Sequence, residues 1–314
     1  MEWDRRTFLK TASLTACSSV TQAADESGCG LAIGTYGLQS LPLADAIRLV
    51  AKTGFDAVEF TVFPGSSGDI STVLKETRAR TEIRELLENS GLRVSALMAD
   101  LKPSEDDDVH LKQLYHIAEL IQLAKDLSPS NPPIIQTILG GKNWEVSRNL
   151  FRDRLANWNQ ILADQKGYLS IKPHRGQAMA TPAEAKWLFG QLGNPPRLRM
   201  VYDYSHYAFN DPPLSISRSV AESLSVANYV AMKDAVIEDG KVKFALVGES
   251  NSWDQAEVVR ELYQGGYRGD FCCEVSSQIW RNDPLYNAVD GTETCYRNLL
   301  AAFERAGVPR SGNL

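Results

Sequence analysis

The sequence has few cysteines, and they lack the spacing that metal sites and redox motifs require. Five occur in 314 residues, and no two of them form a Cys-x-x-Cys pair. Two of them are adjacent, so on one strand their side chains would face opposite sides. We therefore expect small, buried hydrophobic side chains, and neither a disulfide framework nor a cysteine metal site. The five are Cys17, Cys29, Cys272, Cys273 and Cys295.

The sequence also lacks a surplus of positive charge and any long apolar run. Lysine and arginine number 33 against 39 acidic residues, which gives a formal net charge of -6, and the basic residues are scattered among acids. Nucleic-acid binding depends largely on basic patches that contact phosphates, so we expect no nucleic-acid partner. The apolar stretch near the amino terminus is too short to cross a bilayer, so we expect no transmembrane span.

The first 27 residues have the character of an export signal. Arg5 and Arg6 are followed by Thr-Phe-Leu-Lys and then by a weakly apolar stretch, a pattern that resembles a twin-arginine signal. The run from Leu14 to Cys17 is also similar to a lipoprotein cleavage box, which would place a lipid anchor on Cys17. We predict a signal segment over residues 1–27 and a periplasmic or membrane-tethered protein. The alternative is a basic, amphipathic start with no export role.

Short apolar runs bounded by turn residues recur eight times, at intervals of 27 to 42 residues. Each interval has room for a loop, a helix and a return loop, which is the unit that joins parallel strands. Eight such units predict a single-domain α/β protein, a (β/α)8 TIM barrel over residues 28–306 with a carboxyl-terminal tail over 307–314. The runs end near Ile33, Phe60, Leu97, Ile138, Lys172, Asp203, Met232 and Glu274.

Segments between the runs show helical periodicity and helix-end signals. Apolar residues recur at helical spacing from Leu43 and stop at Gly54, a residue typical of helix ends. Farther along, Thr181 precedes a proline and lies three residues before Glu184, which predicts a capping box at a helix start.

Charged residues stand at the ends of five of the eight predicted strands. Because the carboxyl ends of barrel strands converge on one face, these side chains would repel or pair there unless they serve a site. We expect an active site at that face, and the alternative is a structural network at the barrel mouth. The five residues are Glu59, Lys172, Asp203, Lys233 and Glu274.

Several short motifs in this order resemble those of sugar-phosphate isomerases and epimerases with a xylose-isomerase-like barrel. The segment 54–59, Gly-Phe-Asp-Ala-Val-Glu, resembles their second strand, and segments 173–176 and 201–206 fill the fifth and sixth units. The resemblance is greatest from Met232 to Glu274 and extends over about residues 30–303. It implies a barrel enzyme that forms and quenches an enediolate on a carbohydrate or ketosugar.

The resemblance also implies a divalent metal held by a glutamate, an aspartate, a histidine and a second glutamate on strands five to eight. Asp203 and Glu274 match two of these ligands, but Lys172 and Ala231 stand where the strand-five glutamate and the strand-seven histidine are expected. Lysine at neutral pH has no free lone pair, and alanine has no donor atom. The usual four-ligand site is therefore absent.

Two arrangements of this altered site remain open. In the first, the site holds no metal, and the ammonium of Lys172 lies between Asp203 and Glu274 and keeps both carboxylates ionised. In the second, Asp203, His206, Glu274 and His174 form a rearranged site that binds manganese, zinc, magnesium or iron weakly.

Each candidate site residue has an expected role. Glu274 is the first candidate for the catalytic base, and Lys172 is expected to stabilise an oxyanion or, without its proton, to act as the base. His174 and His206 follow as candidates for proton transfer. We expect Arg175, Lys233, Glu59 and Glu249 to bind the substrate, the two cations at its oxygen or carboxylate groups and the two acids at sugar hydroxyls.

Three functions are compatible with these residues. The first is a sugar isomerase or epimerase, or a related lyase, with a small carbohydrate as substrate. The second is a carbohydrate-binding barrel without catalytic activity, which the two missing ligands favour. The third, a phosphodiester-cleaving barrel, needs several metal ions, and the four histidines of the chain make it the weakest.

Overall fold

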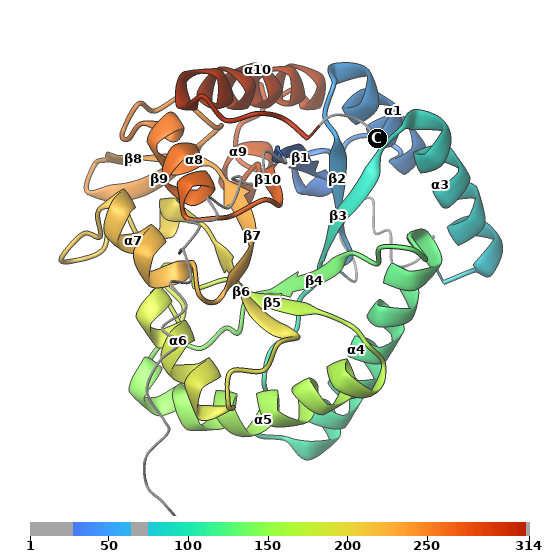
Figure 1. The fold of residues 1–314 in the computed structure, drawn as a ribbon, viewed down its shortest axis with the longest axis vertical. Coiled ribbons are helices and arrows are strands. Elements are labelled where there is room, and N and C mark those ends of the chain that lie inside the picture. The colour runs from blue at the N-terminus through green and yellow to red at the C-terminus, as the bar shows by residue number, and fades with distance from the viewer. Residues whose placement is uncertain (1–27, 64–74, 312–314) are drawn as a thin grey trace, which may run out of the picture.

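The computed structural model describes residues 28–63 and 75–311, and within them eight parallel strands close into a barrel (Figure 1). The first and last barrel strands, β1 and β10, pair with each other and complete the closure. The expected (β/α)8 fold is confirmed. The barrel strands are β1 Gly30–Gly34, β2 Ala57–Thr61, β3 Arg93–Met98, β4 Ile134–Thr137, β5 Leu169–Ile171, β6 Leu198–Tyr202, β7 Ala227–Met232 and β10 Asp270–Cys273.

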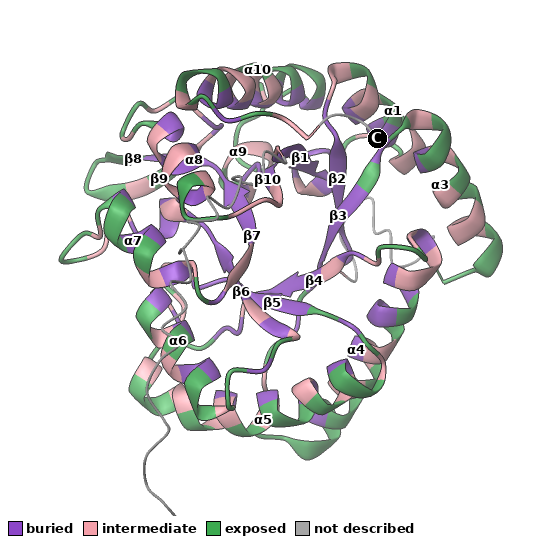
Figure 2. Ribbon diagram, in the orientation of Figure 1, coloured by how far each residue is buried: buried purple, intermediate pink, exposed green. Residues whose placement is uncertain are grey.

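Helices surround the barrel, and their buried residues face it (Figure 2). The larger helices are α1 Leu43–Thr53, α3 Thr77–Ser90, α4 Asp107–Leu127, α5 Trp144–Asp164, α6 Pro182–Gln191, α7 Ile216–Ser223, α8 Gln255–Gln264 and α10 Ala288–Ala306. Shorter elements lie at the site face: η1 Thr35–Gly37, η2 Tyr204–His206, α9 Ser277–Trp280, and a hairpin of β8 Asp234–Glu238 and β9 Lys241–Ala245.

Two helix-end signals of the sequence are confirmed. Helix α1 ends at Gly54, which has a φ of 107°, a left-handed conformation that glycine adopts without steric cost. Thr181 and Glu184 form the predicted capping box at the start of α6. The box satisfies free amide groups of the first turn of α6, and the Gly54 amide bonds to carbonyls of the last turn of α1, so one end of each helix is fixed by its own sequence.

The core has two layers, one outside the barrel wall and one inside it. Most large buried side chains pack between the strands and the helices. The inner layer consists of smaller residues together with Tyr229: Ala32, Ala57, Ala96, Val201, Tyr229, Ala231 and Cys272. Since side chains alternate along a strand, residues two positions after these also point inward, and the charged strand ends occupy such positions. The pattern thus directs the charges into the barrel mouth.

The cysteine predictions hold for the described part of the chain. Cys29, Cys272, Cys273 and Cys295 are free and buried. Cys272 packs in the inner layer and Cys273 in the outer layer, so the two face opposite sides of the strand. Cys17 and the rest of the predicted signal segment, residues 1–27, lie outside the described residues.

The chain ends of the described region meet beside the first strand. Cys29 pairs with Arg310 in an isolated parallel bridge, and Ser311 donates its amide hydrogen to the Cys29 carbonyl. This part of the predicted tail is therefore attached to the barrel. Among the described residues, none of the helices combines the length and the apolar character needed to cross a membrane.

Candidate functional site

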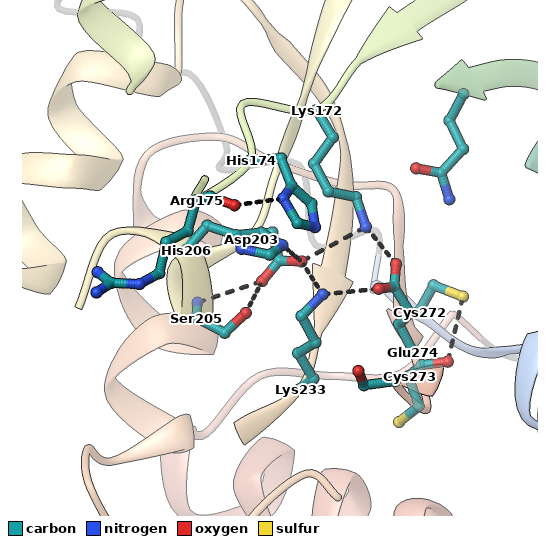
Figure 3. A network of polar contacts seen from close by, with 12 residues as sticks. Lys172, His174, Arg175, Asp203, Ser205, His206, Lys233, Cys272, Cys273 and Glu274 are labelled. Atoms are coloured by element: carbon teal, nitrogen blue, oxygen red, sulfur yellow. Dashed lines mark hydrogen bonds and ion pairs between the residues drawn. The ribbon is translucent and has the colours of Figure 1, made fainter. Parts of the chain in front are cut away.

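Four charged side chains from four neighbouring strands meet at the barrel mouth (Figure 3). Lys172, Asp203, Lys233 and Glu274 each stand immediately after a barrel strand, β5, β6, β7 and β10 respectively. All four are buried, with exposed fractions between 0 and 8%. We call this group the charge ring.

Each amine of the charge ring contacts both carboxylates. The Lys172 amine donates to Glu274 Oε2 and lies 3.5 Å from Asp203 Oδ2. The Lys233 amine lies 2.6 Å from Glu274 Oε1 and 3.0 Å from the same Asp203 oxygen. The two carboxyl groups of Asp203 and Glu274 are therefore bridged twice, and the predicted position of Lys172 between them is found.

The pKa values of Lys172, Asp203 and Glu274 keep these three members of the ring charged at neutral pH. Burial alone would lower the pKa of Lys172, but the carboxylates of Glu274 and Asp203 outweigh it and hold this pKa above its ordinary value. Burial would raise the pKa of Glu274, yet Lys172 and Lys233 hold it well below the usual range. The pKa of Asp203 is likewise lowered, against burial, by Lys233 and then Lys172. Lys172 is thus a hydrogen-bond donor and not a base.

Asp203 is fixed by the short helix that follows it. Its Oδ1 accepts from the amide and from the hydroxyl of Ser205, at 3.2 and 2.6 Å, as the amino-terminal cap of η2. These bonds leave Oδ2 directed at the two amines. Because both donors belong to Ser205, two residues farther along, the sequence fixes the orientation of this carboxylate locally.

Two histidines lie side by side next to the ring. The ring centroids of His174 and His206 are 3.9 Å apart, and His206 Nε2 lies 3.4 Å from Asp203 Oδ2. Burial, followed by the ammonium groups of Lys233 and Lys172, lowers the pKa of His174 to about 4. Burial and Lys233 also lower the pKa of His206. Both imidazoles are therefore neutral at pH 7.

The tautomer of His174 follows from its backbone contact. Its Nδ1 lies 2.7 Å from the carbonyl oxygen of Arg175, which can only accept, so Nδ1 carries the proton. In a neutral imidazole the other nitrogen then has a free lone pair. His174 Nε2 is accordingly a hydrogen-bond acceptor at the site.

Glu59 on β2 differs from the other two carboxylates. Its Oε2 accepts from the side-chain amide of Gln136, and its buried Oε1 has no hydrogen-bond partner among the described residues. Gly34 on β1 leaves room for it, because a Cβ there would lie 2.9 Å from Oε1. Burial and the Glu274 carboxylate raise the pKa of Glu59 to about 7, against the opposing effect of Lys172.

A pocket of about 380 Å³ opens above the charge ring. It lies over the carboxyl ends of β3, β4, β5 and β10, which is the face where TIM barrels carry their active sites. Of the charge ring and the two neighbouring histidines, Lys172, Glu274 and His174 line the pocket. The pocket is lined by Tyr36, Phe63, Met98, Ala99, Asp100, Gln136, Thr137, Ile138, Lys172, His174, Glu274 and Arg281.

The β8–β9 hairpin covers Lys233 of the charge ring and the neighbouring His206. The ring of Phe244 on β9 lies 4.8 Å from the Lys233 amine and packs edge-on against His206, with 5.5 Å between the ring centroids. Sequence reasoning missed this hairpin. Its signal was the dipeptide Asp239-Gly240, where both residues have positive φ as a tight hairpin turn requires.

None of the four expected substrate-binding residues lines the pocket. Lys233 belongs to the charge ring and Glu59 is buried on β2, while Arg175 and Glu249 have other surroundings. The guanidinium of Arg175 donates to the carbonyl of Phe209, and Figure 3 shows it directed away from the amines. Glu249 is exposed on the turn after β9 and is not part of the pocket lining. Ala231, at the expected histidine position, is buried in the inner layer of the barrel. Of the pocket lining, Tyr36 and Arg281 carry no local sequence signal, since their loops reach the mouth only through the closed fold.

A family model described as xylose isomerase-like TIM barrel matches residues 47–297. The chain belongs to this family. A search of curated proteins gave no match. The fold is the one that the sequence resemblance implied, so the resemblance to xylose-isomerase-like barrels is confirmed.

Solved structures with the same fold include members with different activities. The chain is similar to the IolI protein with a bound zinc atom, at 14% identity, covering 88% of this chain and 99% of that one with a TM-score of 0.72. It is similar to AsbF of Bacillus anthracis, a probable 3-DHS dehydratase, at 15% identity over 86% and 98%, with a TM-score of 0.67. An L-ribulose 3-epimerase is 16% identical over 89% and 97%, with a TM-score of 0.64. At this level of identity the similarity concerns the fold.

The charge ring does not fit a divalent metal such as the zinc atom bound in the IolI structure. Among residues 28–63 and 75–311, there is no group of three or more His, Cys, Asp or Glu side chains that could hold an ion. The space between Asp203 and Glu274 is occupied by two ammonium groups, which repel a cation and offer no lone pair. Asp203 and Glu274, which the resemblance assigns to the metal, instead contact the amines of Lys172 and Lys233.

Proposed function

We propose that this protein is an enzyme of the sugar isomerase or epimerase type that moves a proton on the carbon next to a carbonyl group. The observation that carries the proposal is the Lys172 ammonium, held by two carboxylates on the floor of the pocket. An enediolate places negative charge on a carbonyl oxygen, and a fixed cation beside that oxygen stabilises it. No metal is required for this step in the arrangement that we propose.

Lys172 acts in this proposal as the hydrogen-bond donor to the substrate oxygen. The contacts to Glu274 and Asp203 fix the amine and keep it protonated, so these two residues are positioning groups. Both oxygens of Glu274 are engaged by ammonium groups, which argues against the base role first expected for it. Lys233 completes the ring and is shielded by Phe244.

His174 is the proposed proton acceptor. It lines the pocket, its pKa of about 4 leaves it unprotonated at neutral pH, and its Nε2 carries the free lone pair. His206 lies behind it, buried, and supports the ring of His174 from one side. In the forward step His174 Nε2 takes the proton from the carbon beside the carbonyl, the C–H electron pair forms the C=C bond of the enediolate, and the carbonyl π pair moves to the oxygen at Lys172. His174 then returns the proton to the former carbonyl carbon, the C=C pair forms that new C–H bond, and the hydroxyl proton passes to the oxygen at Lys172 as the neighbouring C–O bond becomes the new carbonyl.

The proposed substrate is a small carbohydrate with a carbonyl group. The epimerase among the similar structures supports this class, because its name gives a sugar, L-ribulose, as the substrate. The aromatic side chains of Tyr36 and Phe63 give the pocket an apolar wall that suits the face of a sugar.

Exchange of carbon-bound hydrogen with solvent tests the proposal. Aldoses, ketoses and keto-inositols are incubated in D2O with the protein, and 1H NMR follows the loss of the signal at the carbon beside the carbonyl. We expect exchange with the wild type and a loss of about 100-fold or more in Lys172→Met, because a single oxyanion donor contributes that much to catalysis. Lys186→Met, which changes an exposed lysine on α6, is the control.

A second function has one observation in its favour. Because both oxygens of Glu274 are occupied by amines, the pocket has fewer free carboxylates than a sugar isomerase with two glutamates would use. A barrel that binds carbohydrate without turnover would bind a sugar of the panel with no deuterium in the recovered sugar. That outcome would replace the enzymatic proposal.

A further inference from the structure

The charges on the pocket floor cancel one another. Two ammonium groups and two ionised carboxylates form the charge ring, so the ring as a whole has no surplus charge to attract an ion. Asp100, which also lines the pocket, is paired with Lys102 at 2.9 Å. His174 is neutral at pH 7. The floor can therefore orient polar groups, but it does not select a charged substrate.

Arg281 supplies the uncompensated charge of this pocket. It is exposed at the end of α9, lines the pocket, and its guanidinium carbon lies 4.6 Å from the ring centroid of Trp280. Across the described part of the chain, no carboxylate lies within ion-pair distance of it, whereas most other arginines there are paired. Positive charge at the rim is thus available to a ligand.

An aromatic stack connects this arginine to the rest of the pocket. Trp280 packs edge-on against Tyr36, with 5.4 Å between ring centroids, and Tyr36 packs in the same way on Phe63 at 5.7 Å. The stack holds the guanidinium at one end of an apolar wall, while Lys172 lies on the floor of the same pocket. A guanidinium resting on an aromatic face keeps its outer edge free for two parallel hydrogen bonds.

We propose that Arg281 binds an anionic group of the substrate, a carboxylate or a phosphate, while the carbonyl end of the same molecule reaches Lys172. This inference rests on the proposed function for the role of Lys172 and adds the substrate class: sugar acids or sugar phosphates rather than neutral sugars. The carbon skeleton lies along the wall of Tyr36 and Phe63. Arg281 is then the residue that determines specificity, and it takes no part in the proton transfer.

Binding of three hexose probes tests the inference without requiring turnover. Isothermal titration measures the affinity of the wild type for glucose, gluconate and glucose 6-phosphate at low and at moderate ionic strength. We expect at least one anionic probe to bind about 10-fold or more tighter than glucose, the gain of a charge-assisted hydrogen-bond pair. Added salt should reduce this preference, because the rim is exposed. Preference for gluconate identifies a carboxylate substrate, and preference for glucose 6-phosphate a phosphorylated one.

Two variants attribute the preference to this arginine. Arg281→Gln should bind all three probes alike, and Arg281→Lys should retain part of the preference, since it keeps the charge but loses the two-fold hydrogen bonding. Arg148→Gln is the matched control, because Arg148 also lies over a tryptophan, 5.1 Å from the ring of Trp187, but outside the pocket. The control should bind like the wild type, and circular dichroism verifies that each variant is folded.

The inference is overturned if the anionic probes bind the wild type no tighter than glucose, including no binding at all, or if Arg281→Gln keeps the preference. Its failure can be distinguished from failure of the proposed function. If neutral sugars take up solvent deuterium equally with the wild type and with Arg281→Gln, the anionic substrate is rejected and the proposed enzymatic function stands. Tight, Arg281-dependent binding of an anionic probe without exchange in any sugar acid or phosphate would keep the anion site and reject the proton transfer.

Discussion

Glu59 is the buried carboxylate of the site that has no cation in direct contact among the described residues. Asp203 and Glu274 each contact two ammonium groups, and their pKa values are lowered. Glu59 instead accepts one hydrogen bond from Gln136, and burial raises its pKa to about 7. Glu59 therefore contributes less to stability as the pH rises, whereas Asp203 and Glu274 contribute less as the pH falls.

The wild type should lose stability between about pH 5 and pH 8 as Glu59 ionises, and Glu59→Gln should not show this loss. The pKa of Glu59 is raised from 4.5 to about 7 on folding, so its contribution is complete below the lower value and is lost as the pH rises through the upper one. At about 1.4 kcal/mol per pKa unit, the loss amounts to roughly 3 kcal/mol at pH 8. Urea denaturation at pH 5 and pH 8 measures the free energy of unfolding in Glu59→Gln and in the wild type.

The control for this experiment is Glu85→Gln, which changes an exposed glutamate on α3 and should leave the wild-type pH dependence intact. A Glu59→Gln protein that loses as much stability as the wild type between the two pH values would contradict the assignment. Asp203 and Glu274 act in the opposite sense, because their lowered pKa values give stability that is lost only as the pH falls into the acid range.

At the scale of whole elements, the barrel strands were predictable and the β8–β9 hairpin was not anticipated. Each strand is a short apolar run between turn residues, and the polar residue that ends it marks the face of the site. The hairpin lies inside the 42-residue interval between the seventh and eighth strand ends, which a loop and a helix alone would fill. Its strands are short and half exposed, with an alternation too weak to stand out beside the buried strands.

We expect the hairpin to exclude water from the charge ring and from His206. Phe244 covers both the Lys233 amine and the ring of His206, and burial is the main cause of the lowered pKa of His206. In Phe244→Ala water reaches these groups, so the pKa of His206 should rise toward its ordinary value of about 6.5. Two-dimensional NMR of the imidazole protons, recorded against pH, measures this shift.

Val236→Ala provides the comparison for Phe244→Ala. Val236 lies on the same hairpin but is 37% exposed, so its truncation should leave the titration of His206 as in the wild type. If His206 titrates identically in Phe244→Ala and in the wild type, the hairpin does not seal the site. A shift in both variants would instead mean that the hairpin acts as a whole and not through the aromatic ring.

For the molecule as a whole, the candidate site could be predicted only as far as strand order allows. The closed barrel requires that residues ending β5, β6, β7 and β10 meet, and the sequence therefore predicts the neighbourhood of Lys172, Asp203 and Glu274. It does not predict that Lys233 contacts the same two carboxylates as Lys172, because strand alternation gives the direction of a side chain but not which neighbouring groups its amine reaches. The course of the loops also decides that Arg281 lines the pocket and that Glu249 does not.

The charge ring is stable only as a complete set. Two opposite charges about 4 Å apart gain roughly 4 kcal/mol at an effective dielectric near 20, a gain that the loss of hydration opposes. Four alternating charges balance this loss better than one pair, since every group has two opposite neighbours. A divalent cation at the same place would add charge to a ring that is already neutral.

Removal of metal should therefore leave the protein unchanged. We expect that protein purified without chelators contains well under one equivalent of manganese, zinc, magnesium or iron by mass spectrometry, and that EDTA changes neither the melting temperature nor deuterium exchange.

The variant Lys172→Glu should bind a divalent metal, because the change removes one ammonium and adds a carboxylate beside Asp203 and Glu274. Three carboxylates within reach of one another bind divalent ions well, so added Mn2+ should raise the melting temperature of Lys172→Glu and not that of the wild type. Stoichiometric metal in the wild type, or a melting temperature that falls on chelation, would mean that the two lysines move aside for an ion, and the mechanism built on the Lys172 ammonium would have to be given up.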